Sequence, residues 1–290
     1  MALSIHLGAH KTASTHLQYS LRQVRDRLAQ AGLFYADPGT LRDVLPLSQA
    51  LARGEGCPAE LSCRRQFQAA REGFADLLIS EENILGGTHR SKIYSQRGTL
   101  YPRAPHRLRR VIDMAGGGPA TLYLALRDPA GFHVSAFALQ LSEGNEIELD
   151  AYMGGRDPAR APWSGLVKRL KQVEGVGWIV VWRYEDYAAL RPELLARLLP
   201  EGMAGSVPEP EPRNVSITQP GYDWFVAQAM ADNQADLRDL FRQARQKFPR
   251  RKGHPRLRLL DEAAHERSAG FYRAEIEALA RMPGVELLLP

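Results

Sequence analysis

Short apolar runs alternate with amphipathic stretches along most of the chain, and this alternation restricts the possible folds more than any other feature. Leu3, Ile5 and Leu7 alternate with Ser4 and His6, which is the two-residue period of a strand. Three more runs, largely uncharged, suit strands buried on both faces: 75–80, 121–126 and 178–182. Apolar residues recur at helical spacing in other segments: 17–28, 163–170 and 187–198. Strands that alternate with helices predict an α/β fold with a central, mainly parallel sheet flanked by helices.

The C-terminal part of the chain has a different pattern. Residues 201–221 are rich in proline and in small or acidic residues, which is typical of a long loop. The segments 222–248 and 257–280 are helical in pattern, and 285–289 has the only further strand signal. Because two helices do not bury an independent core, we predict one domain. From the N-terminus, its parts are an α/β core (1–200), the proline-rich loop (201–221) and a helical C-terminal cap (222–290).

Composition limits the environment of the protein and the kind of ligand it binds. The formal net charge of +5 favours an anionic ligand without identifying it. Cys57 and Cys63 are the only cysteines, and no His or Cys cluster with metal-ligand spacing surrounds them, so we expect a reduced, cytoplasmic protein. No apolar run approaches the roughly 18 residues of a membrane helix, and no signal-peptide pattern precedes the first strand. We therefore expect neither secretion nor a membrane span.

The loop after the first strand reads GAHKTAST, from Gly8 to Thr15. In a parallel α/β sheet this loop lies at the carboxyl edge, where the next helix presents free N–H groups to an anion. A Walker A loop places its lysine later and directly before Ser or Thr, whereas only two residues separate Gly8 from Lys11. The pattern therefore argues against a magnesium–triphosphate site, and the hydroxyls that follow Lys11 suit a single phosphate. The alternative is a capped helix start, with Thr12 or Ser14 as the N-cap.

A second polar segment, RDPAGFHVS, follows the run 121–126. Arg127 ends the predicted strand, and Asp128 and Pro129 are typical N-cap and first-turn residues of a helix. Ser135 lies eight positions after Arg127, two helical turns into that helix. An arginine fork and a serine hydroxyl in these places can hold one phosphate from two sides. An RDP turn on its own is common and is usually structural.

Taken together, HKTAST and RDPAGFHVS resemble the 5′-phosphosulfate and 3′-phosphate loops of sulfotransferases that use 3′-phosphoadenosine 5′-phosphosulfate (PAPS). Both loops occur in the family order and at predicted strand ends. Weaker similarities are WRYED (182–186), RNVS (213–216) and RKG (251–253). The resemblance implies a P-loop NTPase-like, three-layer α/β fold and a PAPS donor whose product is 3′,5′-adenosine bisphosphate.

The resemblance also implies a role for each loop residue. Lys11 would contact the 5′ phosphosulfate and its bridging oxygen, and Arg127 and Ser135 would bind the 3′ phosphate. His16 takes the place of an aromatic side chain beside the adenine. The remaining residues of the loop would surround the 5′ phosphate: His10, Thr12, Ala13, Ser14 and Thr15.

Ala13 departs from the family, which usually has glycine there. If the position needs positive φ, alanine costs roughly 1 kcal/mol or more, and if it belongs to the first helical turn, alanine costs nothing.

The resemblance places the general base just after the strand ADLLIS, where Glu81 and Glu82 follow. Adjacent side chains at a strand end point in opposite directions, so at most one of the two faces the cleft. We favour Glu82, with Glu81 and then His89 as further candidates. The alternative is that these residues cap the next segment or face solvent.

We therefore predict a cytoplasmic PAPS-dependent sulfotransferase that needs no metal. Its acceptor is a hydroxyl or amine of an unidentified small molecule, carbohydrate or lipid, and neither a nucleic-acid partner nor an oligomeric state is predicted. Basic residues between 90 and 110 could line an acceptor groove, bind nucleic acid or form a solvated loop. The alternatives for the whole protein are a non-catalytic nucleotide- or anion-binding module of the same fold and a P-loop kinase.

Overall fold

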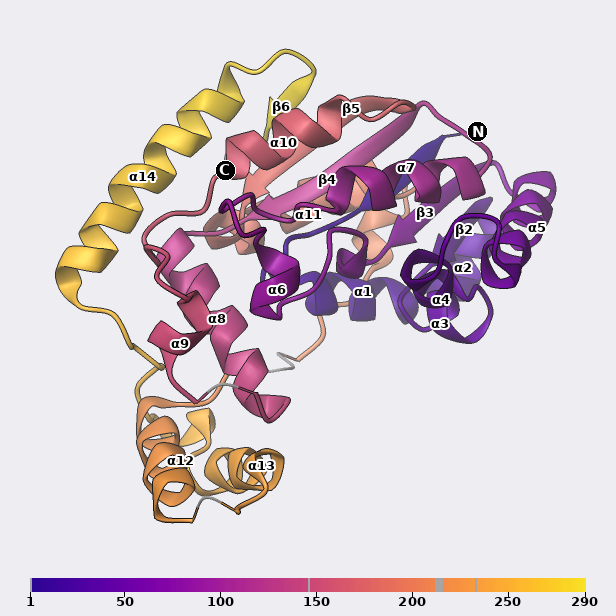
Figure 1. Ribbon diagram of the computed structural model, residues 1–290. Helices are drawn as coiled ribbons and strands as arrows, with labels where there is room; N and C mark the ends of the chain where they lie inside the picture. The colour runs from indigo at the N-terminus through magenta and orange to yellow at the C-terminus, as the bar shows by residue number, and fades with distance from the viewer. Residues whose placement is uncertain (1, 146, 212–215, 233) are drawn as a thin grey trace.

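The computed structural model describes residues 2–145, 147–211, 216–232 and 234–290. Its centre is a six-stranded sheet with the strand order β2-β3-β1-β4-β5-β6, in which every neighbouring pair is parallel (Figure 1). The strands are β1 (Leu3–His6), β2 (Leu33–Ala36), β3 (Asp76–Ser80), β4 (Ala120–Leu126), β5 (Val176–Arg183) and β6 (Val285–Leu287). The prediction of an α/β fold with a mainly parallel sheet is confirmed. All strands therefore end at the same edge of the sheet.

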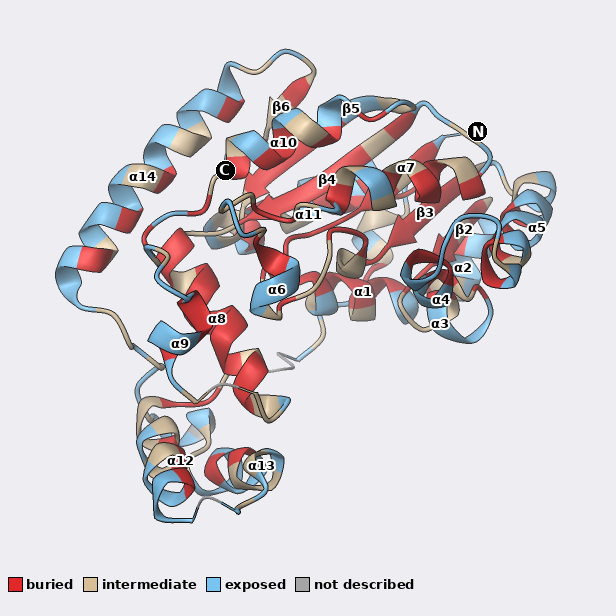
Figure 2. Cartoon of the chain, viewed as in Figure 1, coloured by how far each residue is buried: buried red, intermediate tan, exposed pale blue. Residues whose placement is uncertain are grey.

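Helices cover both faces because parallel neighbours are joined by crossover connections. Residues of one buried cluster come from α5 (Pro58–Gly73), α7 (Ala104–Met114), α8 (Pro129–Ser142), α10 (Trp163–Lys171) and α14 (Glu262–Ala280). The cluster on the other face takes residues from α1 (Ser14–Arg22), α2 (Arg25–Gln30) and α11 (Tyr187–Leu198). The sheet is thus the middle of three layers, and Figure 2 shows buried residues gathered in the strands and in α8.

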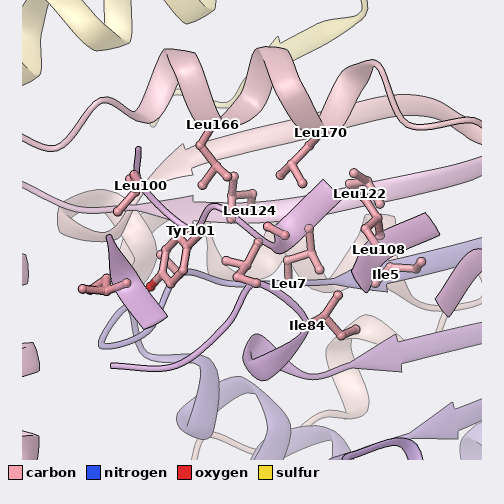
Figure 3. Packing of buried hydrophobic residues seen from close by; sticks show 14 of the residues in the cluster. Ile5, Leu7, Ile84, Leu100, Tyr101, Leu108, Leu122, Leu124, Leu166 and Leu170 are labelled. Carbon is pink, nitrogen blue, oxygen red and sulfur yellow. The ribbon is translucent and has the colours of Figure 1, made fainter. Parts of the chain in front are cut away.

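Alternate residues of each central strand supply the two faces. In β4, Leu122 and Leu124 belong to the cluster beneath α7 and α10, whereas Tyr123 and Ala125 belong to the cluster beneath α1 and α11. Figure 3 shows the first cluster, in which leucines of α10 meet leucines of β4. The near absence of polar positions in these runs follows from burial on both faces.

Short elements connect the layers. The α-helices among them are α3 (Thr40–Asp43), α4 (Leu47–Ala52), α6 (Arg90–Ile93) and α9 (Leu149–Met153). The 3₁₀ helices are η1 (Glu82–Ile84), η2 (Tyr184–Asp186), η3 (Ala204–Ser206) and η4 (Arg250–Lys252). Within the parts of the chain that are described, no helix is both long enough and apolar enough to cross a bilayer.

The C-terminal part adds helices and one strand. Helices α12 (Gln219–Ala231) and α13 (Leu237–Lys247) pack on each other, and α13 packs against α8 beyond its sheet-facing turns (Figure 1). The strand signal at 285–289 is confirmed as β6, which pairs with β5. The proline-rich segment 201–221 contains η3 and the start of α12, and 212–215 lie outside the described residues.

Two parts of the fold differ from the sequence prediction. The segment at Leu33–Ala36 forms β2 at an edge of the sheet, although its four residues gave no clear strand pattern. The helical pattern of 17–28 is divided between α1 and α2, because Gln23 and Val24 end one helix and begin the next.

Part of the basic tract 90–110 is structural. Arg110 is 3% exposed and its guanidinium bonds Glu60 at 2.6 Å and the carbonyl oxygen of Ala50 at 2.7 Å. Arg107 donates to the carbonyl oxygen of Asn83 at 2.8 Å. These two arginines lie on α7 and satisfy carbonyl groups of neighbouring loops, so neither a solvated loop nor an acceptor groove describes them.

We expect Arg110→Ala to lower the free energy of unfolding by about 3–5 kcal/mol, because Glu60 loses its buried partner and keeps the more exposed Arg64, and because the carbonyl oxygens of Ala50 and Arg53 lose their donor. The matched control is Arg109→Ala, one residue earlier on α7, whose partner Glu55 is exposed and whose partner Asp113 is half-buried. This control should cost less than about 1 kcal/mol. Urea unfolding at neutral pH measures both, and equal effects of the two substitutions would show that burial of the Arg110 pair is unimportant.

Candidate functional site

The chain continues beside β4 after β1 ends and then turns sharply. The N–H of Leu7 donates to the carbonyl oxygen of Tyr123 at 2.9 Å, and that of Ala9 donates to Ala125 at 3.1 Å. Beyond this point Lys11 and Ala13 have φ values of 67° and 66°, in the left-handed region that disfavours side chains with a Cβ. The loop is therefore a strained turn at the carboxyl edge of the sheet.

Ala13 is the N-cap of α1, and no side chain caps this helix. The alternative that Thr12 or Ser14 is the N-cap is therefore wrong. Thr12 Oγ1 donates instead to the carbonyl oxygen of Ala9. The positive φ of Ala13 also answers the question raised by the missing glycine, since the backbone here is one that glycine adopts without strain.

Ser14 has a buried hydroxyl with no hydrogen-bond partner in the described parts of the chain. A Cβ on Gly8 would lie 2.2 Å from this hydroxyl oxygen, and the φ of Gly8 is 43°, so a larger residue would be strained and would displace the Ser14 hydroxyl. The first N–H groups of α1 have no acceptor within the helix, as at any helix start. Free N–H groups beside an unsatisfied hydroxyl make the inside of this loop suitable for an anion.

Arg127 follows the last residue of β4 and reaches back to the loop. Its Nη1 donates to the carbonyl oxygen of Lys11 at 2.7 Å, and its guanidinium lies 4.6 Å from the centre of the Tyr184 ring. The backbone oxygen of Arg127 accepts from Trp163 Nε1 at 2.9 Å. Contacts with Lys11, Tyr184 and Trp163 thus fix the side chain and the backbone of Arg127 at the carboxyl edge of the sheet.

The start of α8 matches the sequence prediction. Asp128 is the N-cap and accepts from the N–H of Gly131 at 2.8 Å, and Pro129 is in the first turn. A Cβ on Gly131 would lie 3.3 Å from Arg127 Nε, so this face of α8 borders the arginine. Ser135 is buried one turn further along the same face. The structure therefore places Ser135 on the side of α8 that Arg127 borders.

Positive charge dominates the site. Burial lowers the pKa of Lys11, Arg127 and Arg245 lower it further, and only Glu82 opposes them. Among the residues that the structure describes, neither Lys11 nor Arg127 forms an ion pair with a carboxylate. Half-buried cations without carboxylate partners strongly favour an anionic ligand.

The neighbouring glutamates at the end of β3 point to different partners. Glu81 is 2% exposed, and its Oε1 accepts from the backbone N–H and the side-chain amide of Asn83 at 3.0 and 2.7 Å. Its Oε2 has no hydrogen bond and lies 3.6 Å from Arg42 Nη2. Burial raises the pKa of Glu81, and the charge of Glu82 adds to this effect. Glu81 is therefore an enclosed cap of η1.

Glu82 is half-buried, and its Oε2 accepts from Gln18 Nε2 at 2.9 Å. Gln18 comes from α1, the helix that begins at the loop, and Glu82 is close enough to Lys11 to affect its pKa. Of the two glutamates, Glu82 is therefore the one that lies on the loop side.

The three candidate histidines have separate surroundings. His10 is hydrogen-bonded through Nδ1 to the Tyr101 hydroxyl at 2.8 Å, and burial lowers its pKa to about 4, so its ring is neutral at pH 7. His16 Nδ1 is 3.0 Å from the Tyr187 hydroxyl on α11, and Thr15 beside it is exposed. His89 caps α6 by accepting from the N–H of Ser91. The contact that His89 makes is therefore a helix cap, which is a structural role and not one that a general base requires.

Sequence reasoning missed several residues of the site. Gln18 could have been found as a polar residue between Leu17 and Leu21 on the buried side of α1. Tyr184 belongs to the WRYED segment, which suggested only a strand end and a helix cap. The segment with RKG also approaches the site. The pKa of Arg127 is lowered mainly by burial, and the charge of Arg256 in this segment lowers it further. Most of RNVS lies outside the described residues.

The fold and the site together define a parallel α/β protein with a basic loop at the carboxyl edge of its sheet. No protein-family model matches the chain, and no curated protein matches it. Among the described residues, no group of three or more His, Cys, Asp or Glu side chains is placed to hold a metal ion.

We expect Ala13→Gly to stabilise the protein by up to about 1 kcal/mol, because relief of the left-handed strain exceeds the entropy that glycine adds to the unfolded chain. The control is Ala274→Gly at an exposed position inside α14, which should destabilise by about 1 kcal/mol. Denaturant unfolding measures both variants. Destabilisation of similar size in both would contradict the left-handed conformation of Ala13.

Proposed function

We propose that this protein is a P-loop-like sulfotransferase that transfers a sulfuryl group from PAPS to a hydroxyl or amine. The observation that carries the proposal is the contact between Arg127 and the backbone of Lys11, which lie 116 positions apart in the sequence. The two sequence segments that resemble the phosphosulfate and 3′-phosphate loops of the family are therefore adjacent in space. A chance pair of short motifs would not have to meet at one sheet edge.

The residues present suit the donor nucleotide. Lys11, Ser14 and the first turn of α1 offer a cation, a buried unsatisfied hydroxyl and free N–H groups for the 5′ phosphosulfate. Arg127 and Ser135 would hold the 3′ phosphate, with the Tyr184 ring fixing the plane of the guanidinium. His16 and the neighbouring 201–211 segment would border the nucleotide, since burial lowers the pKa of His16 and the backbone of Pro210 is close enough to oppose this effect.

The bound donor supplies an activated sulfuryl group with a phosphate as its leaving group. Lys11 would neutralise the charge that develops on the departing phosphate oxygen. Glu82 would take the proton from the acceptor hydroxyl or amine, and Gln18 would hold the glutamate carboxylate in one orientation. Glu81 suits this role less, because its carboxylate is enclosed and bound to Asn83.

Arg127 should discriminate between nucleotides by their 3′ phosphate. Arg127→Ala is expected to weaken 3′,5′-adenosine bisphosphate binding by about 10- to 100-fold, the value of one or two charge-assisted hydrogen bonds. Adenosine 5′-monophosphate, which lacks the 3′ phosphate, should bind the variant and the parent similarly. Isothermal calorimetry with both nucleotides measures the difference.

Lys11→Ala should weaken the binding of both nucleotides, since both carry the 5′ phosphate. The control is Arg281→Ala, whose exposed side chain pairs with Glu277 on α14. Competition with magnesium ATP tests the kinase alternative at the same time. Absence of bisphosphate binding by the parent protein, or preference for magnesium ATP, would overturn the proposed function.

Glu82→Gln should lower the rate of PAPS turnover by about 10²- to 10⁴-fold while bisphosphate affinity stays within a factor of a few. Release of the bisphosphate, with water or an added alcohol as acceptor, reports this rate without knowledge of the natural acceptor. Glu277→Gln on α14 is the control. Unchanged turnover in Glu82→Gln would show that Glu82 is not the base, whereas bisphosphate binding without PAPS turnover by the parent protein would support a non-catalytic nucleotide-binding module.

A further inference from the structure

A pocket of about 430 Å³ lies between the end of α8 and the helix α13. Its lining consists of Ser142 from α8 and Arg238, Phe241, Arg242, Arg245 and Gln246 from α13. The volume is within the range of small-molecule sites, which hold roughly 300–1,000 Å³. None of the residues of the PAPS loops lines it, so the pocket is distinct from the proposed nucleotide site.

The arginines reach one pocket because of their spacing on α13. Arg238, Arg242 and Arg245 recur at intervals of four and three, which brings them onto one face of the helix. Phe241 and Ala244, between them, are buried and fix this helix against the rest of the protein. The sequence signal was therefore present in LRDLFRQARQK as a stripe of arginines beside an apolar stripe.

The positive charge of the pocket is only partly neutralised. Arg242 pairs with Asp239, and Arg238 Nε donates to the carbonyl oxygen of Glu143 at 2.9 Å. Within the part of the chain that is described, Arg245 has no hydrogen-bond or ion-pair partner, and no carboxylate lines the pocket. Three guanidinium groups therefore face one carboxylate on their own helix, which leaves a site that favours an anion.

Arg245 also connects this pocket to the reaction site. Its charge is one of the causes that lower the pKa of Lys11, after burial and Arg127. The wall of the pocket that Arg245 forms is thus within electrostatic range of the lysine proposed to meet the leaving group.

We propose that the pocket between α8 and α13 binds an anionic group of the sulfate acceptor, so that the acceptor is an acid that also carries a hydroxyl or amine. This inference rests on the proposed function and adds the substrate class. The anion is a carboxylate, phosphate or sulfate, and Phe241 is the one apolar side chain among the described lining residues. The donor is a less suitable occupant, because Lys11, Arg127 and Ser135 already provide for its phosphates.

Nuclear magnetic resonance of the arginine Nε–H groups tests the inference on the full chain saturated with 3′,5′-adenosine bisphosphate. Sodium glucuronate, inorganic phosphate and inorganic sulfate are titrated separately, with methyl glucoside as the neutral counterpart of glucuronate and sodium chloride as the salt control. Single Arg→Lys variants assign the signals. At least one anion should shift the Nε–H signals of Arg238, Arg242 and Arg245. The anion that binds best identifies whether the acceptor group is a carboxylate, a phosphate or a sulfate.

Arg242→Ala should weaken the binding of that anion by about tenfold, as expected for a lost charge-assisted hydrogen bond, without changing bisphosphate affinity. Arg281→Ala should change neither. Shifts of equal size with methyl glucoside or sodium chloride, or none with any anion, would overturn the inference while the proposed function stands. Failure of the parent to bind the bisphosphate would overturn the proposed function, and with it the assignment of the pocket to an acceptor.

Discussion

The parallel pairing of β1 with both β3 and β4 is the constraint on which the rest of the site depends. Leu3 is in register with Leu77 on one side and with Ala120 on the other, so β1 and β3 end side by side and β4 continues three residues further. The segments that follow them carry Lys11, Glu82 and Arg127. A cation, a carboxylate and an arginine fork therefore meet because of backbone hydrogen bonds, before any side chain has contributed. The layers of helices serve this arrangement by covering both faces of the sheet.

The sequence predicts the parts of this architecture that repeat a local pattern. Uncharged runs gave β3, β4 and β5 within one or two residues, and Asp128 and Pro129 gave the start of α8 because an N-cap and a first-turn proline act locally. The edge strand β2 was missed, since four residues are too few to show a period and its pairing with β3 is a long-range interaction.

The site was less predictable than the fold. The sequence could not decide between positive φ and a helical turn at Ala13, because the answer depends on how the loop meets β4. The charges of Arg107 and Arg110 suggested solvent or a ligand, and only the tertiary structure shows that they bond loop carbonyl groups and Glu60. Gln18 acquires its role only when α1 lies beside the end of β3.

Because the chain returns to the sheet as β6, the helices α12 and α13 lie in a segment whose two ends are both anchored to the layers around the sheet. The chain leaves the layers after α11, returns to them with α14 and then pairs Val285 with Ile179 of β5. The entropy of closing such a loop grows only slowly with its length, by about 0.6 kcal/mol per doubling. Changes at the exposed positions of α12 and α13 can therefore accumulate at little cost to the sheet, provided that the buried Phe225, Phe241 and Ala244 keep these helices in place. Evolution could change what this part of the protein recognises while the chemistry at the end of β1 stays the same.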